Sequence, residues 1–120
     1  IRWLDAVRNG NVAKILADHA PDCVMFDVSP PEEGVRGTEA YSAAWRPFVQ
    51  WIRDGAHFDP EELFVEAGDS VGFAWALIRC GTDDDLLRAP RRRLRLSFGL
   101  RSDVQGRWSI VHEHHSFTHS

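Results

Sequence analysis

The chain is 120 residues long, which is enough for one domain with its own core and too short for two. It contains 14 Lys and Arg against 18 Asp and Glu, a formal net charge of −4, so a nucleic-acid-binding surface is not expected. No apolar run approaches the roughly 20 residues that span a bilayer, and the first residues do not resemble a leader peptide. We therefore expect a single cytoplasmic domain over residues 1–120 that binds neither nucleic acid nor membrane.

Two short helices and a strand are predicted at the beginning of the chain. Apolar residues at helical spacing over 1–7 stop at Asn9-Gly10, a sequence typical of a helix end. A second helical stripe over 12–16 ends before Pro21, and the apolar segment 23–28 then predicts a strand. A loop rich in proline and glutamate follows.

A long amphipathic helix is predicted over residues 38–53, ending at Gly55. Trp51 lies off its apolar stripe, and an exposed tryptophan of this kind is typical of a subunit interface. The inward stripe consists of Tyr41, Trp45, Phe48, Val49 and Ile52.

The second half of the chain changes to the two-residue period of strands. Between the second and third of these strands, the acidic run 83–85 and the arginines of 91–95 predict a solvated hairpin tip. Because helices come first and strands last, the pattern favours an α+β fold in which one strongly curved antiparallel sheet wraps around about three N-terminal helices. The four predicted strands are 57–67, 70–80, 94–102 and 108–117.

The two cysteines, Cys23 and Cys80, both fall in predicted strands and have no Cys-x-x-Cys spacing. We expect them to be small buried hydrophobic residues in a reducing compartment, without a disulfide.

The last strand carries the pattern that suggests a pocket. If its side chains alternate regularly, one face turns from apolar to polar along the strand, as is expected where a strand first seals a core and then lines a ligand site. That face would present Trp108, Ile110, His112, His114 and Ser116, and the opposite face would present Ser109, Val111, Glu113, His115 and Phe117.

Three segments resemble the NTF2-like superfamily of cone-shaped α+β domains, which includes ketosteroid isomerase and the SnoaL-type polyketide cyclases. The segments are 16–19, the stretch 24–31 followed by 37–40, and 106–116, the last with the sequence GRWSIVHEHHS. The third segment also resembles the association domain of calmodulin-dependent protein kinase II. The resemblance covers nearly the whole chain, and it implies the cone fold and homodimers that pair through the sheet. One fold of this kind hosts many functions.

Asp27 is the first catalytic candidate. In the ketosteroid isomerases that this segment resembles, an aspartate at the corresponding strand end removes a proton next to a carbonyl, which requires partial burial and a nearby donor. The resemblance places Trp3 and Arg95 near the donor positions of the isomerase, but an indole and a fixed cation differ from the groups used there. The alternative is that Asp27 braces the proline loop after it.

His112 and His114 are the other catalytic candidates, with three interpretations. They could act as acid and base opposite Asp27. They could hold a metal ion if Asp27 or His57 supplied a third ligand, or they could be structural. We expect neither a metal nor any other cofactor.

Arg79 ends an alternating apolar row on the second strand, formed by Val71, Phe73, Trp75 and Leu77. It is therefore expected at the mouth of the pocket. The segment 77–79 resembles the kinase association domain, where a matching arginine lies in the pocket, which implies that Arg79 holds a ligand carboxylate; alternatively, Arg79 pairs with Asp27 or Glu39. Regular alternation on the third strand turns Arg95 away from the pocket, against the resemblance.

Together these patterns predict a cone that binds a small molecule. It would act as an isomerase, cyclase or hydratase on a small apolar carbonyl or carboxylate compound, or else serve as a non-catalytic dimerisation and ligand-binding module. The predicted ligand-contacting residues are Tyr41, Trp45, Phe48, Trp75, Arg79, Phe98, Ser116 and Trp3.

Overall fold

The computed structural model describes residues 7, 9 and 16–119. Trp3 and most of the two helices predicted over 1–7 and 12–16 lie outside these residues. The described part contains two helices, where about three N-terminal ones were expected, and neither is long and apolar enough to cross a bilayer. In chain order the elements are β1 (His19–Phe26), β2 (Val35–Arg36), α3 (Thr38–Arg53), β3 (His57–Ala67), β4 (Val71–Gly81), α4 (Asp83–Arg88), β5 (Leu94–Ser102) and β6 (Trp108–Phe117).

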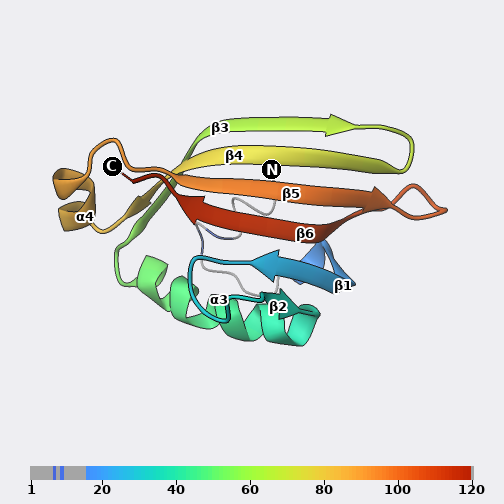
Figure 1. The fold of residues 1–120 in the computed structure, drawn as a ribbon, viewed down its shortest axis with the longest axis horizontal. Helices are drawn as coiled ribbons and strands as arrows, with labels where there is room; N and C mark the ends of the chain where they lie inside the picture. Colours follow the sequence, from blue (N-terminus) through green and yellow to red (C-terminus); the bar gives the residue numbers. More distant parts are fainter. Residues whose placement is uncertain (1–6, 8, 10–15, 120) are drawn as a thin grey trace.

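The six strands form one curved sheet in the order β2-β1-β6-β5-β4-β3 (Figure 1). The long strands β3 to β6 form a meander of antiparallel neighbours, as predicted. The pairing of β1 with β6 is parallel, so the prediction of a wholly antiparallel sheet is wrong. These strands are the first and last of those described, and no tight hairpin between them fixes their relative direction.

Helix α3 has the predicted bounds and lies across one face of the sheet (Figure 1). Its buried side chains are Tyr41, Trp45 and Val49, at the i, i+4, i+8 spacing of one helix face. These residues pack with Met25 of β1 and the inward residues of β4 and β5 in one core. The space between helix and sheet is therefore where a ligand cavity could form.

Residues 83–88 form a helix, so the predicted solvated hairpin tip is wrong at this position. The Thr82 hydroxyl accepts a hydrogen bond from the Asp85 backbone at 3.1 Å, and the Asp85 carboxylate accepts one from the Thr82 backbone at 3.0 Å. This reciprocal capping box starts α4, and the acidic first turn complements the helix dipole.

A β-bulge in β6 decides which side chains face the core. Gly99 of β5 pairs with His112, and the next residue, Leu100, pairs with Ile110, which leaves Val111 as an extra residue. After the bulge the alternation is reversed, because a one-residue slip exchanges the two faces of a strand. Ile110 is buried, and so are Glu113 and His115, which are 1% and 5% exposed.

Strand β4 also faces opposite to the prediction. Its inward residues are Ala74, Ala76, Ile78 and Cys80, all buried. The row of Phe73 and Trp75 lies on the outer face of the sheet, with exposed fractions of 48% and 39%. Both rows of β4 are apolar, so alternation alone cannot show which row is inside. The row on β5 was predicted correctly, with Leu94, Leu96 and Phe98 buried and Arg95 exposed. Cys23 and Cys80 are buried free thiols.

Candidate functional site

A cavity of about 620 Å³ lies between α3 and the sheet, at the carboxyl ends of β1 and β6. Its volume is in the range of sites for small organic molecules. Most of its wall is apolar, and the polar side chains among the described lining residues are Asp27, Ser29, His115 and the indole groups. The lining residues are Met25, Asp27, Val28, Ser29, Pro30, Pro31, Val35, Ala44, Trp45, Pro47, Phe48, Trp51, Leu94, His115 and Phe117.

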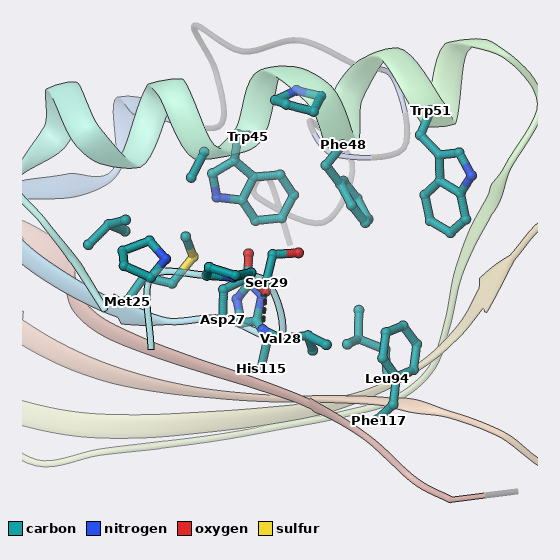
Figure 2. A pocket seen from close by; sticks show the side chains of 15 residues that line it. Met25, Asp27, Val28, Ser29, Trp45, Phe48, Trp51, Leu94, His115 and Phe117 are labelled. Carbon is teal, nitrogen blue, oxygen red and sulfur yellow. Dashed lines mark hydrogen bonds and ion pairs between the residues drawn. The ribbon is translucent and has the colours of Figure 1, made fainter. Parts of the chain in front are cut away.

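The cavity has a polar end and an apolar end. Figure 2 shows Trp45, Phe48 and Trp51 projecting from α3 toward the sheet. Asp27, Ser29 and His115 lie below Trp45, whereas Leu94 and Phe117 lie below Trp51. The three aromatic rings are successive neighbours, with centroids 5.0 Å apart for Trp45 and Phe48 and 5.5 Å for Phe48 and Trp51. A bound molecule would thus meet its polar contacts at one end only.

Asp27 follows directly after β1, on the same side of the strand as the buried Met25. One carboxylate oxygen, Oδ1, accepts a hydrogen bond from the Val28 backbone at 2.7 Å and lies 3.4 Å from Nδ1 of His115. Both contacts within the described residues use Oδ1, and the side chain is 32% exposed. Oδ2 therefore remains available to a ligand.

His115 lies between two carboxylates. Its Nδ1 faces Asp27, and its Nε2 is 2.8 Å from Oε1 of Glu113. Glu113 is fully buried, and its second oxygen contacts Nε2 of His19 and accepts a hydrogen bond from the Tyr41 hydroxyl at 2.5 Å. A continuous network thus joins the cavity to the centre of the core. It connects β1, α3 and β6.

The network shifts the pKa values of His115, Glu113 and Asp27. Burial would lower the pKa of His115, but hydrogen bonds to Asp27 and Glu113 and their charges raise it to about 9. Burial would raise the pKa of Glu113, but hydrogen bonds from His115 and His19 lower it to about 2. Burial also opposes ionisation of Asp27, yet the hydrogen bond and charge of His115 bring its pKa below the usual value. At neutral pH an imidazolium therefore separates two carboxylates.

The two histidines predicted as catalytic do not line the cavity. His112 donates a hydrogen bond from Nδ1 to the carbonyl oxygen of Val24, 2.7 Å away. His114 is exposed, and both rings lie against Phe26, at centroid distances of 5.2 and 5.8 Å. The expectation that they face Asp27 is wrong, because the bulge in β6 turns them to the outer face of the sheet.

The predicted ligand-contacting residues that the structure describes separate into four groups. Trp45 and Phe48 line the cavity, while Tyr41 and Phe98 are buried in the core nearby. Trp75 lies on the outer sheet face. The remaining two described residues are elsewhere: Ser116 accepts a hydrogen bond from Arg95 at 3.1 Å, and Arg79 lines a separate cavity with His57 and Asp83.

Sequence reasoning missed His115, Glu113 and His19, which form the network behind Asp27. It also placed Trp51 and Phe117 on surfaces, whereas both line the cavity. The adjacent pair His114-His115 guarantees that one imidazole faces inward from β6, but only the bulge decides which one.

Among the described residues, no three or more His, Cys, Asp or Glu side chains are arranged to hold a metal ion. His115 has carboxylates at both nitrogens, which suits a protonated imidazole and not a metal ligand.

Comparison with known proteins places the chain in a family. The model of the SnoaL-like domain matches residues 1–120. An NTF2-like protein of unknown function from Pseudomonas putida is 32% identical, with a TM-score of 0.80 over 96% of this chain and 78% of that one. No curated protein matches in sequence.

Two more distant structures share the fold. A candidate ketosteroid isomerase from Shewanella frigidimarina is 16% identical, with a TM-score of 0.73 over 96% of this chain and 89% of that one. A SnoaL-like protein of unknown function from Burkholderia thailandensis is 20% identical, with a TM-score of 0.67 over 98% and 88%. The chain belongs to the SnoaL-like domain family, within the NTF2-like superfamily.

Proposed function

We propose that this domain binds a small, largely apolar molecule in the cavity between α3 and the sheet, with Asp27 as the contact for its polar end. The observation that carries this proposal is the free oxygen Oδ2 of Asp27 at one end of a cavity whose other walls are mostly apolar. A few polar groups that orient a ligand within apolar walls are typical of small-molecule sites.

A second candidate function is acid–base catalysis, as in an isomerase, cyclase or hydratase acting on a carbonyl compound. The contact between Asp27 and His115 favours it, because an imidazolium beside the carboxylate fixes the orientation of a proton acceptor. The lowered pKa of Asp27 favours binding instead, since it makes the carboxylate a weaker base. A carboxylate ligand held by Arg79 is not part of this proposal, because Arg79 lines a different cavity.

Two measurements test the binding function. Native mass spectrometry of the purified protein and thermal shift with a panel of small aromatic molecules report binding. Replacement of Trp51 by Ala removes one cavity wall and should weaken any ligand found, whereas Leu87→Ala, on the exposed side of α4, should not. Equal binding by both variants would place the ligand elsewhere.

Catalysis is tested by proton exchange at carbon. The protein is incubated in deuterated water with simple aryl ketones, and loss of the α-proton signal is followed by NMR. Exchange accelerated by the wild type and lost in Asp27→Asn would support the acid–base function. No acceleration, together with clear binding, would leave the domain as a binding module.

We further propose that this domain forms a homodimer, in which its protein partner is a second copy of this chain. The apolar patch, which we define as Phe64, Val71, Phe73 and Trp75, lies on the outer sheet face. Phe64 stacks on Trp75 at 5.7 Å and lies 6.0 Å from Phe73. Exposed apolar patches of this kind mark interaction surfaces.

The residues beside the apolar patch suit pairing with an identical surface. Glu62 and Glu66 of the edge strand β3 lie on the outer sheet face, on either side of Phe64 along the strand. Arg95 and Arg101 of β5 lie on the same outer face. A two-fold axis through the patch can bring the acidic edge of one copy to the basic strand of the other.

A further inference from the structure

We propose that the cavity selects molecules whose polar end is a protonated amine and whose other end is apolar. This inference rests on the proposed binding function and names the class of ligand. It depends on where the charges of the site lie, on which donors surround them, and on the direction in which the cavity becomes apolar.

Asp27 is the charged group that a ligand reaches first. Its Oδ1 is occupied by the Val28 backbone and by His115, and Oδ2 is left for the ligand. The positive charge of His115 lies behind this carboxylate, and both of its ring nitrogens are engaged, at 3.4 Å from Asp27 and 2.8 Å from Glu113. Both nitrogens of His115 therefore have a protein carboxylate beside them, so a ligand anion would compete with Asp27 and Glu113 for the imidazolium.

Apart from Ser29, the loop beside Asp27 offers few donors to a negatively charged group. Pro30 and Pro31 have no backbone N–H, and the Val28 N–H is already donated to Asp27. The described lining residues include no Lys or Arg. A ligand carboxylate at this end would face the Asp27 carboxylate in a mostly apolar space, where like charges repel strongly.

Aromatic rings next to the carboxylate favour a cation. The Trp45 ring lies 5.8 Å from the His115 ring and 5.0 Å from Phe48, so a head group that reaches Asp27 passes along aromatic surface. Ammonium groups bind favourably to such ring faces as well as to carboxylates. Beyond Phe48 the cavity is bounded by Trp51, Leu94 and Phe117, which suit an apolar tail (Figure 2).

The test compares three probes of similar shape: 3-phenylpropylamine, 3-phenylpropan-1-ol and 3-phenylpropionate. Binding at pH 7 is measured by calorimetry, with the wild type, Asp27→Asn and Asp69→Asn. Asp69 is an exposed aspartate in the turn between β3 and β4 and serves as the matched control. Circular dichroism confirms that each variant is folded, and Asp27→Glu retains the charge if Asp27→Asn does not fold.

We expect the amine to bind at least about tenfold more tightly than the carboxylate, with the alcohol between them. The preference should fall to about threefold or less in Asp27→Asn and persist in Asp69→Asn and Asp27→Glu. Tighter binding of the carboxylate would overturn the inference while leaving the binding function intact. An amine preference that survives in Asp27→Asn would also overturn it, and binding of none of the three would contradict the proposed function as well.

Discussion

At the scale of single residues, the central feature is a fully buried glutamate whose two oxygens have three side-chain partners. Glu113 contacts His115 through one oxygen and His19 and Tyr41 through the other. A buried carboxylate is tolerated only when its charge is compensated and hydrogen-bonded, and here the partners come from three separate elements. Glu113 therefore joins β1, α3 and β6, and through His115 it acts on Asp27.

We predict that Glu113→Gln lowers the pKa of His115 from about 9 toward the ordinary range of histidine, because one of the two carboxylates that stabilise the imidazolium is lost. An NMR titration of the His115 ring protons measures this directly and requires no ligand. Glu62→Gln, at an exposed position of β3, is the control and should leave the titration unchanged. An unaltered His115 titration in Glu113→Gln would show that Glu113 does not set its charge.

Loss of the Glu113 carboxylate should also destabilise the fold. Glu113→Ala leaves His19, Tyr41 and His115 without their shared buried partner, and removal of one side of a buried charged pair typically costs about 3–5 kcal/mol. Urea denaturation followed by tryptophan fluorescence measures the free energy of unfolding. A loss below about 1 kcal/mol would mean that the network contributes little to stability.

The pH dependence of stability follows from the same network. The pKa of His115 is raised from 6.5 to about 9, so its stabilising contribution is complete below pH 6.5 and disappears as the pH rises through 9. We predict a melting temperature that decreases between pH 7 and pH 10. The decrease should be smaller in Glu113→Gln, whose His115 gains less from being protonated. A wild-type melting temperature that is flat over this range would contradict the assignment of His115 as an imidazolium.

At the scale of elements, the loop between β1 and β2 shapes the polar end of the cavity, and its packing depends on Gly34. This residue has φ of +89°, and a Cβ there would lie 2.6 Å from Cδ1 of Phe26 and 2.8 Å from the carbonyl oxygen of Met25. The second contact is with backbone, which cannot easily move. Glycine is therefore required both for the turn and for the close approach of the loop to β1.

We predict that Gly34→Ala destabilises the protein by about 2–4 kcal/mol, the sum of a strained backbone and an overpacked contact. Gly106→Ala is the matched control, because Gly106 has a similar φ of +79° with nothing within 4 Å of its Cβ position. It should cost only the backbone strain, about 1–2 kcal/mol. Chemical denaturation of both variants measures the difference, and equal losses would mean that the loop does not pack as described.

The bounds of α3 and of β3 to β6 could be predicted from the sequence because α3 has a clear helical period, the strands are long runs rich in apolar residues, and glycine or aspartate follows α3, β3 and β5. The faces of β4 and β6 could not. Both rows of β4 are apolar, and the bulge at Val111 depends on how β6 pairs with β5, which is not encoded in β6 alone. Asp27, Trp45 and Phe48 were predicted as pocket residues and line the cavity, whereas Trp51 was assigned to a subunit interface, and the imidazole beside Asp27 was assigned to His114 and His112 and not to His115.

The other difference from the sequence prediction concerns α4. The Thr82-x-x-Asp85 spacing is that of a capping box, but in a charged segment of six residues it competes with the ordinary preference of aspartate for turns. The contact of Leu86 with the core, where it is 8% exposed, decides in favour of the helix. Tertiary contacts of this kind are not visible in a local pattern.

At the scale of the whole molecule, the sheet has two apolar faces with different roles. The inner face packs against α3 and borders the cavity, while the outer face carries the apolar patch of Phe64, Val71, Phe73 and Trp75. The cavity and the patch lie on opposite sides of the same sheet. A partner on the outer face would therefore leave Asp27 and the aromatic wall of α3 accessible to a ligand.

We predict that Trp75→Glu converts the protein from a dimer to a monomer, because it places a charge within the apolar patch, next to Phe64 and opposite the same patch of the second copy. Sedimentation velocity over a range of concentrations measures the oligomeric state. Leu87→Glu is the control: Leu87 is 81% exposed on α4, outside the patch, so its replacement should leave the dimer intact. A wild-type protein that is monomeric at high concentration, or a dimer that survives in Trp75→Glu, would exclude the patch as the interface. Because the cavity opens on the other side of the sheet, the monomeric variant should still bind the amine probe with an affinity within about threefold of the wild type.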